Sequence, residues 1–575
     1  MVSRRRVLLG LALCAVAVAA GCGGGSSSSS GSGGSGGSSS TASGSPQKGG
    51  TFTILANSNF GVADPAQNYT LQQWALLITT HDGLVGFKRA GGAAGTELVP
   101  DLATEIPEPT DGGKTYAFQL RDGIKYSDGT PLKASDFVTV FTRQFTVPGP
   151  ANGFYAGIVG GQECLKNSKT CDMTKGVVAD DSANTVTIHL TAPDPEFLDK
   201  LALPFAFAVP GNTSLKLTGN DVPPGTGPYM WQSYNPNKSA VLVRNPNFKE
   251  WSAEAQPDGN PDSIVEKFGL PVTDAVTAVE NGSADAVFAG DSIPADRLNE
   301  IDTQYADQTH VNALTADWYF ALNVNEPPFD NLQARQAINF AADRTAYVKI
   351  AGGPSLAVPT CQILPPNFPG YEPYCPYTAG ADSDNTKWTG VDLTKAKDLV
   401  KQSGTSGAKV VVVGTTDEVG KALALQMVSD LKAIGYDASA KLLASGPQYA
   451  YVQNSDNHVQ VGWSAWYQDY PAASDFLNVL LGCDSYHPHS DASPNIAGFC
   501  DKDIQAKMDQ ASAMGVTDPE GANKIWAEVD HDVTDQAPWV DLYNPKQIDF
   551  LSKRVQGYQW SPQWYLLYDQ LWLNQ

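Results

Sequence analysis

The stretch GKTYAFQLRDGIKYSDGTPLKASDF, residues 113–137, contains a dense run of local structural signals. Phe118-Gln119-Leu120 alternates apolar and polar side chains, as a half-buried strand does. Asp122-Gly123 and Asp128-Gly129 are dipeptides typical of tight turns, because glycine adopts the backbone conformations that such turns require. Ser135 or Asp136 can accept hydrogen bonds from the first amide groups of a helix. The stretch therefore predicts a strand, two turns and a helix start.

Further strands and helices are predicted on both sides of this stretch. Residues 50–55 and 186–190 alternate in polarity and indicate strands. A helix is predicted after Asp330 or Asn331, either of which can cap it. Its apolar face has positions at helical spacing: Ala334, Ala337, Ile338 and Ala341.

The segment 409–443 predicts a complete strand, helix and strand. Val410–Val413 is the first strand, and Gly435 ends the helix. The helix has one apolar stripe: Leu423, Met427, Leu431 and Ile434. Such crossover units build α/β domains, so this segment indicates a second α/β lobe. No long Pro/Gly linker divides the body, and we expect short crossing strands to join the lobes about a hinge.

The first 47 residues resemble an export signal followed by a tether. Arg4-Arg5-Arg6 precedes an apolar run that is too short to span a bilayer, and small residues precede Cys22. This order resembles the bacterial lipobox, so we expect residues 1–21 to be a lipoprotein signal peptide and Cys22 to be lipidated. Residues 22–47, rich in Gly and Ser, predict a flexible tether. Both an arginine-rich Sec signal and a twin-arginine signal fit the sequence.

The composition excludes some partners. The chain has a formal net charge of −23 at pH 7, and nucleic acid would be repelled by so acidic a body. The charge fits a field that attracts cationic solutes, but we favour the alternative that it is the surface of an ordinary secreted protein.

Six of the eight cysteines remain after Cys14 in the signal and Cys22 are set aside. Six cysteines allow fifteen connectivities, and nearest-neighbour closure is the simplest. It gives three bridges of the kind that form in an oxidising compartment: Cys164–Cys171, Cys361–Cys375 and Cys483–Cys500.

We predict no metal site and no cofactor. The cysteines form no C-x-x-C cluster, and His487-Pro488-His489 is the only close histidine pair in the sequence. Its proline favours a loop. Gly113-Lys114-Thr115 lacks the preceding glycine of a phosphate-binding loop, because Glu108 stands at that position. We find no nucleophile with a base, so an enzyme is not predicted.

Residues 113–137, together with Pro100-Asp101-Leu102-Ala103, resemble the signature of a known family. The family comprises the dipeptide-, oligopeptide- and nickel-binding proteins of ABC importers, the bacterial extracellular solute-binding proteins of family 5. Weaker matches support it across nearly the whole mature chain: residues 81–85, 225–229, 244–248, 284–286 and 322–325. The resemblance implies a two-lobed α/β fold of the periplasmic-binding-protein type II-like class (cluster C), with an extra subdomain in the N-terminal lobe.

The resemblance also implies a domain plan and a function. Lobe I is expected to comprise residues 48–315 with 541–575, including the extra subdomain at about 81–204, and lobe II residues 316–540. The protein is expected to be a monomeric, extracytoplasmic lipoprotein anchored to the membrane. It would capture peptides, expected to be oligopeptides, in a cleft between the lobes and deliver them to the permease and ATPase subunits of an ABC transporter.

The ligand site is expected near residues 462–471. In peptide-binding relatives this stretch supplies an aspartate for the α-ammonium group, and alignment on the Trp, Asp-Tyr and Phe-Leu residues puts Asp469 there. A desolvated ammonium group needs a charged acceptor. Trp463 and Trp466, with Tyr467 beside them, would form apolar walls that can contact a cation. The alternative is that these aromatic residues fill the core of the second lobe.

Three further observations bear on the ligand. Asn59 and Phe60 correspond to a cleft-lining loop of relatives, although a solvated loop is equally consistent. Ala472 and Ala473 replace an acidic residue and a proline that are common in the family. No basic residue occurs between Lys349 and Lys387, where relatives hold the carboxylate of a dipeptide. We therefore expect a longer peptide or a cationic non-peptide, and a sugar, a metal complex or hydrolase activity remain as alternatives.

Overall fold

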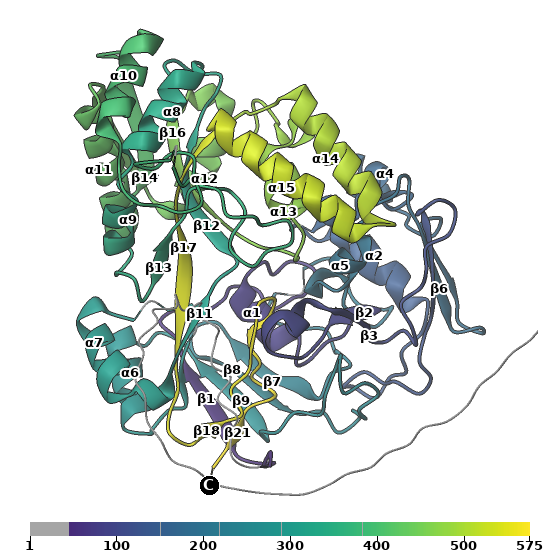
Figure 1. Ribbon diagram of the computed structural model, residues 1–575. Helices are drawn as coiled ribbons and strands as arrows, with labels where there is room; N and C mark the ends of the chain where they lie inside the picture. The colour runs from purple at the N-terminus through teal and green to yellow at the C-terminus, as the bar shows by residue number, and fades with distance from the viewer. Residues whose placement is uncertain are drawn as a thin grey trace, which may run out of the picture. The chain divides into compact units, whose positions relative to one another are not determined.

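Two large β-sheets organise the part of the chain that the computed structural model describes, residues 45–574 except 150, 218, 289, 292 and 382 (Figure 1). The first sheet has the order β10-β1-β9-β8-β7. Its strands are β1 (Thr51–Leu55), β7 (Tyr229–Asn235), β8 (Ser239–Arg244), β9 (Ser263–Lys267) and β10 (Ala286–Val287). Two helices, α6 (Val272–Glu280) and α7 (Ala295–Gln304), share an apolar cluster with β1 and β10. The predicted strand at residues 50–55 is confirmed as β1.

Residues between β1 and β7 form a separate layer with its own apolar core. The sheet β4-β6-β5 consists of β4 (Thr115–Gln119), β5 (Val177–Asp180) and β6 (Thr185–His189). The other elements are α1 (Leu71–Leu77), β2 (Val85–Phe87), β3 (Leu98–Pro100), α2 (Asp136–Thr146), α3 (Asn152–Tyr155), α4 (Gly161–Lys166) and α5 (Phe197–Leu201). One apolar cluster joins most of them. The predicted strands near residues 118–120 and 186–190 are therefore confirmed.

The capping role predicted for Ser135 or Asp136 is wrong. Helix α2 begins at Asp136, but Ser135 makes no side-chain cap bond. The Asp136 carboxylate instead accepts hydrogen bonds from the Lys133 and Gly211 amides, at 2.9 and 2.8 Å, and from the Tyr126 hydroxyl at 2.9 Å. The side chain therefore holds neighbouring loops together and does not cap the helix.

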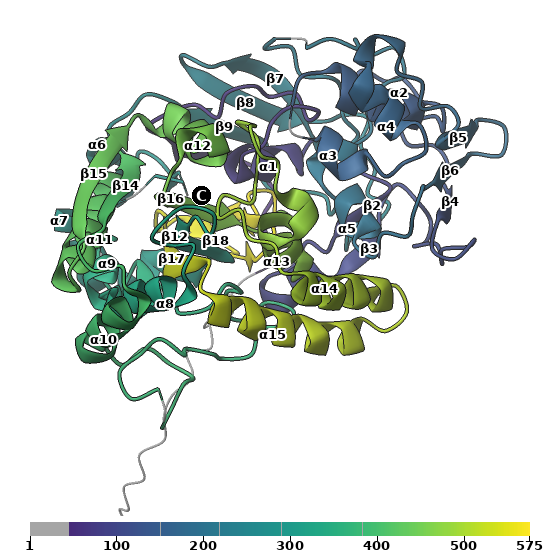
Figure 2. The same cartoon turned by 90° about the horizontal axis from the view of Figure 1, so that it is seen from above.

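The second sheet lies further along the chain and has the order β11-β17-β12-β16-β14-β15, with β13 also pairing with β17. The strands are β11 (Thr309–Ala313), β12 (Ala316–Leu322), β13 (Ala357–Pro359), β14 (Lys409–Thr415), β15 (Asp437–Leu443), β16 (Val461–Tyr467) and β17 (Trp539–Phe550). The helices are α8 (Leu332–Ala341), α9 (Arg344–Ile350), α10 (Leu393–Ser403), α11 (Glu418–Ala433), α12 (Ser445–Gln453), α13 (Ser474–Leu481), α14 (Lys502–Gly515) and α15 (Pro519–Gln536). Figure 2 shows α14 and α15 running side by side.

The strand, helix and strand predicted at residues 409–443 are confirmed. β14 and β15 pair in parallel, and α11 connects them. The four residues of the predicted apolar stripe are all buried. Asp417 caps the helix by accepting a hydrogen bond from the Gly420 amide at 2.8 Å. Asn331, one of the two predicted caps, likewise accepts from the Gln333 amide at the start of α8.

A long antiparallel ribbon runs between the two sheets. Residues 309–313 pair with 546–550 of β17, and residues 318–321 pair with 539–543 of the same strand. An isolated bridge from Ala286 to Leu551 then connects the end of this ribbon to the first sheet. Figure 1 shows β17 extending between the two sheets. The arrangement agrees with crossing strands, while the lobe boundaries at 48–315 with 541–575 and at 316–540 stay predictions.

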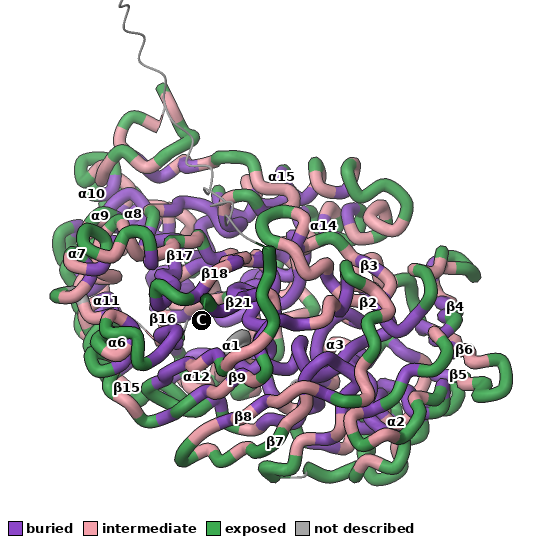
Figure 3. Tube along the Cα trace, turned by 90° about the horizontal axis from the view of Figure 1, so that it is seen from below, coloured by how far each residue is buried: buried purple, intermediate pink, exposed green. Residues whose placement is uncertain are grey.

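The chain end returns to the first sheet. Short strands β18 (Val555–Gln556), β19 (Trp560–Ser561), β20 (Tyr565–Leu566) and β21 (Trp572–Leu573) follow β17. Val555 of β18, Leu566 of β20 and Leu573 of β21 join residues of β1, β8 and β9 in one cluster. Figure 3 shows buried residues along β16 and β17, whereas much of α10 is exposed. Within the described residues, no helix combines the length and the apolar character that a membrane span requires.

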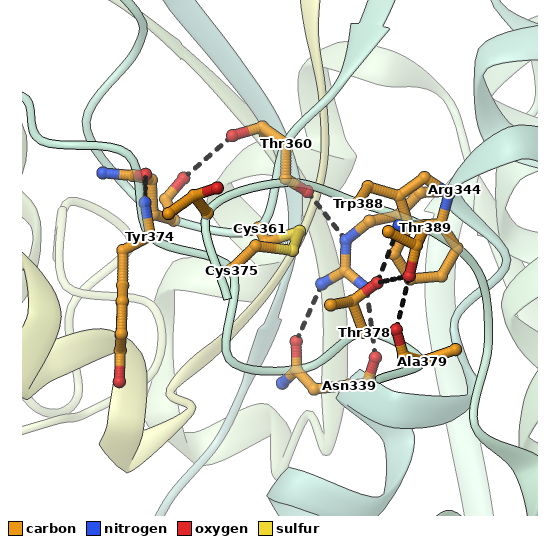
Figure 4. The surroundings of a disulfide bond; sticks show 12 residues. Asn339, Arg344, Thr360, Cys361, Tyr374, Cys375, Thr378, Ala379, Trp388 and Thr389 are labelled. Carbon is orange, nitrogen blue, oxygen red and sulfur yellow. Dashed lines mark hydrogen bonds between the residues drawn. A yellow bond between two sulfur atoms is a disulfide. The ribbon is translucent and has the colours of Figure 1, made fainter. Parts of the chain in front are cut away.

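All three disulfides predicted by nearest-neighbour closure are present, with Cα–Cα distances of 4.4, 4.8 and 4.5 Å in chain order. The bridge between Cys361 and Cys375 closes a loop beside α9 (Figure 4). The Arg344 side chain anchors the base of that loop by donating to the Thr360 carbonyl oxygen at 2.7 Å. The loop is therefore fixed at both its bridge and its base.

Removal of the Cys361–Cys375 bridge should destabilise the protein. Closing a loop of this length stabilises by about 3 kcal/mol, chiefly by restricting the unfolded chain. We expect the double variant Cys361→Ser/Cys375→Ser to lose about that much in urea unfolding under oxidising conditions. A loss within about 0.5 kcal/mol of zero would show that the bridge contributes little, because that is the scale of a neutral surface change.

Candidate functional site

A cavity of about 750 Å³ is lined by segments that are far apart in the sequence. Tyr69 and Asp291 come from the part of the chain that includes the first sheet, while Trp318, Trp466 and Tyr543 come from strands of the second sheet. Its size falls within the range of small-molecule and short-peptide sites. The cavity therefore brings both large parts of the structure to one site.

The central strand β16 supplies the richest part of the lining. It pairs antiparallel with β12 and parallel with β14, so its backbone is held on both sides. Trp463 and Trp466 pack against different apolar clusters, in agreement with the alternation of side chains along a strand. Both still line the cavity, as does Tyr467, whose side chain is 39% exposed. The structure thus brings these three predicted residues to one site with Asp469.

Asp469 lies two residues beyond the end of β16 and is only 6% exposed. Its carboxylate accepts a hydrogen bond from the Tyr69 hydroxyl, which lies 2.6 Å from each oxygen. The Asp469 amide donates to Asp475 Oδ2 at 2.9 Å, and Gln563 Nε2 donates to the Asp469 carbonyl oxygen at 2.8 Å. Tyr69 consequently holds the carboxylate, while Asp475, six residues away, and the more distant Gln563 hold the Asp469 backbone.

Burial is the main cause of the shifted pKa values of Asp469 and Asp475. Loss of hydration raises the pKa of Asp469 to about 7, although the hydrogen bond from Tyr69 lowers it in part. Burial, followed by the nearby charge of Asp469, raises the pKa of Asp475 well above its usual range. Asp475 therefore favours the neutral acid, and Asp469 is the carboxyl group that ionises near neutral pH.

An aromatic wall faces the same cavity. The Trp318 ring lies 5.1 Å from the Tyr467 ring in an edge contact and 6.0 Å from the Tyr543 ring in a stacked one, measured between centroids. The indole N–H of Trp463 is buried and, within the described residues, has no hydrogen-bond partner. Such a donor is costly to leave unpaired, because it has lost its hydrogen bonds to water.

The cavity also contains charged groups that the sequence did not reveal. Asp417 and Asp291 line it, and Asp291 accepts a hydrogen bond from the Asn57 amide at 2.6 Å. Lys546, on β17, is the single basic residue in the lining formed by described residues. Asp417 follows a predicted strand and could have been recognised as a helix cap, but no local pattern relates Lys546 or Tyr69 to residues 462–471.

Asn59 and Phe60 lie away from the cavity. Phe60 is 9% exposed and stacks on Tyr234 at 4.9 Å, with an edge contact to Phe268 at 5.4 Å. Burial of its ring in the core of the first sheet removes apolar surface from water. Asn59 is exposed, and its Oδ1 accepts from the Gly61 amide at 2.8 Å in a local turn. Neither residue is therefore among those that line the cavity.

The histidine pair has a local role in this structure. His489 Nδ1 lies 2.6 Å from Asp456 Oδ1 in an exposed contact. Across residues 45–574, apart from the five positions that are not described, no group of three or more His, Cys, Asp and Glu side chains is arranged to hold a metal ion. Cys22 and the Gly/Ser segment up to residue 44 lie outside the described residues.

The sequence is similar to those of known bacterial solute-binding proteins. The family model "Bacterial extracellular solute-binding proteins, family 5 Middle" matches residues 97–488. The glutathione-binding protein GsiB of Escherichia coli K12 is 24% identical over 521 residues, covering 88% of this chain and 91% of that protein. GsiB of Salmonella typhi is 24% identical over 519 residues, with the same coverage.

Solved structures share the fold at low sequence identity. Clavulanic acid biosynthesis oligopeptide binding protein 2 aligns with a TM-score of 0.83 at 23% identity, over 92% of this chain and 96% of its own. The periplasmic binding protein DppA from Helicobacter pylori, in complex with the peptide STSA, aligns with a TM-score of 0.71 at 20% identity, over 92% and 99%.

Proposed function

Because the chain belongs to family 5 of the bacterial extracellular solute-binding proteins and has their two-lobed α/β, type II-like fold, we propose that it binds peptides for an ABC importer. The observation that carries this proposal is a buried carboxylate, Asp469, facing a cavity with aromatic walls. A peptide supplies what both features need, namely an ammonium group for the carboxylate and apolar side chains for the walls.

The proposed mechanism is capture between two lobes. The ammonium group of the peptide binds Asp469, and Trp463, Trp466 and Tyr467 contact its backbone and side chains. Contacts from both sides of the cavity favour the closed form, which the permease recognises. Relatives that bind glutathione or the peptide STSA support a peptide as the ligand.

The proposal includes the cellular setting. A lipid anchor at Cys22 and the segment 22–47 would hold the binding body outside the membrane, near the permease and its ATPase subunits. The body would act as a monomer. The anchor lies outside the described residues and stays a prediction, as does the export route.

Native mass spectrometry with a peptide pool tests the proposal. The purified protein is mixed with equimolar peptides of two to six residues, and the bound species are identified by mass. We expect retention of peptides, and an excess of glucose or of a nickel–histidine complex should not displace them. Retention of the sugar or the metal complex alone would overturn peptide binding and favour another solute. Cleavage of a retained peptide would instead indicate a hydrolase.

A further inference from the structure

Lys546 is the only basic side chain among the described residues that line the cavity. It extends from β17, close to the turn after α9, and its ammonium group donates to the Pro354 carbonyl oxygen at 2.9 Å. A lysine has three N–H donors, so this contact leaves two of them available. Among the described residues, no carboxylate lies within ion-pair distance of it. A positive charge that faces the cavity therefore lacks a charged partner.

The position of Lys546 relative to Asp469 follows from the strand register. Lys546 is opposite Ala313, while Tyr467 is opposite Ala316, and the Gln468 amide donates to the Thr315 carbonyl oxygen at 3.0 Å. The two charged residues thus lie on strands that flank the same segment, 313–316. Neighbouring strands are about 4.8 Å apart, which separates the two backbones by about 10 Å.

This separation between the two backbones is of the same order as the length of a short peptide with free ends. An extended chain advances about 3.3 Å per residue, so three residues span about 10 Å between the ammonium and the carboxylate. Asp291 and Asp417 add negative charge elsewhere in the lining, which would repel a ligand carboxylate from those positions. Lys546 is the lining group with the charge to receive it.

We propose that Lys546 binds the terminal carboxylate of the peptide and that the cavity selects peptides of about three residues with a free C-terminus. This inference rests on the proposed function, because it assumes a peptide whose ammonium group is at Asp469. Lys546 would also provide a basic partner for the peptide carboxylate, which the segment between Lys349 and Lys387 lacks. The partner comes instead from a strand of the ribbon that connects the two sheets.

The test compares peptide acids with peptide amides. Tripeptides of sequence Ala-X-Ala, with X each of the standard residues except cysteine, are prepared as free acids and as C-terminal amides, and their affinities are measured by calorimetry. We expect the best-binding free acid to bind about 10- to 100-fold more tightly than its amide, as is usual for a hydrogen bond to a charged group. The dipeptide and hexapeptide acids of alanine should show a smaller difference from their amides.

Two variants assign the effect to Lys546. In Lys546→Met the difference between acid and amide should fall below about threefold, because the free acid loses its charged partner. The control Lys553→Met removes an exposed lysine that does not line the cavity and should keep the full difference. A Lys546→Met protein that still prefers acids, or a wild-type protein that binds amides equally well, would overturn the assignment while leaving peptide binding in place. Failure to bind every peptide would overturn both proposals.

Discussion

Asp469→Asn should lower the affinity for peptides by about 100-fold, because it removes the charge that balances a buried ammonium group. Asparagine has nearly the same shape and still accepts a hydrogen bond from Tyr69, so the cavity should keep its form. Calorimetric titration of wild type and variant with the same Ala-X-Ala free acid measures the change. The variant's unfolding curve, recorded in parallel, checks that the fold is retained.

Matched controls separate the charge from other effects. Asp398→Asn removes the same charge from an exposed position on α10 that does not line the cavity, and it should leave affinity unchanged. N-acetylated peptides have no ammonium group, so wild type and Asp469→Asn should bind them with equal affinity. If Asp469→Asn binds free peptides as tightly as wild type does, the ammonium group is not at Asp469.

Peptide affinity should also depend strongly on pH. Burial raises the pKa of Asp469 to about 7, and an ammonium group binds the ionised carboxylate. Below pH 7 a proton must leave Asp469 before the peptide binds, so affinity should fall about tenfold for each pH unit, or roughly 100-fold between pH 7 and pH 5. Above pH 7 the carboxylate is already ionised and the dependence should level off until the peptide amine loses its own proton.

Neighbouring groups do not produce this dependence. Burial raises the pKa values of Tyr69, Tyr449 and Tyr470 above the usual tyrosine value, so all three are neutral between pH 5 and 8. Burial and the charge of Asp469 favour the protonated form of Asp475. Affinity of Asp469→Asn for the same peptide should therefore be flat from pH 5 to 7. An equally steep profile in that variant would assign the titration to another group.

Local sequence patterns predicted elements that are local in space. The run of four valines at residues 410–413 and the apolar stripe from Leu423 to Ile434 are local patterns, and each corresponds to an observed strand or helix. Disulfides between cysteines that are near in the chain were predictable for the same reason. Asp136 shows the limit, because its actual partners include the Gly211 amide, which is distant in sequence.

The site itself depends on contacts that no local pattern reveals. Tyr69 meets Asp469 across 400 positions of sequence, so the hydroxyl partner of the predicted carboxylate was unrecognisable beforehand. Phe60 was expected near the ligand because its loop corresponds to a cleft-lining loop in relatives, but Tyr234 and Phe268 bury it in a core. Lys546 was missed because no local sequence pattern relates its strand to the predicted site. The relation becomes visible only in the pairing of β17 with residues 309–313.

The most direct test of the central claim is a crystal structure of the protein with its best-binding Ala-X-Ala tripeptide. Our account predicts the peptide in the cavity beside Trp463 and Trp466, with its terminal nitrogen about 2.7–2.9 Å from an Asp469 carboxylate oxygen, the usual distance for such a pair. A peptide bound outside this cavity, or one whose ammonium group contacts a different acid while Asp469 keeps only its Tyr69 partner, would contradict it.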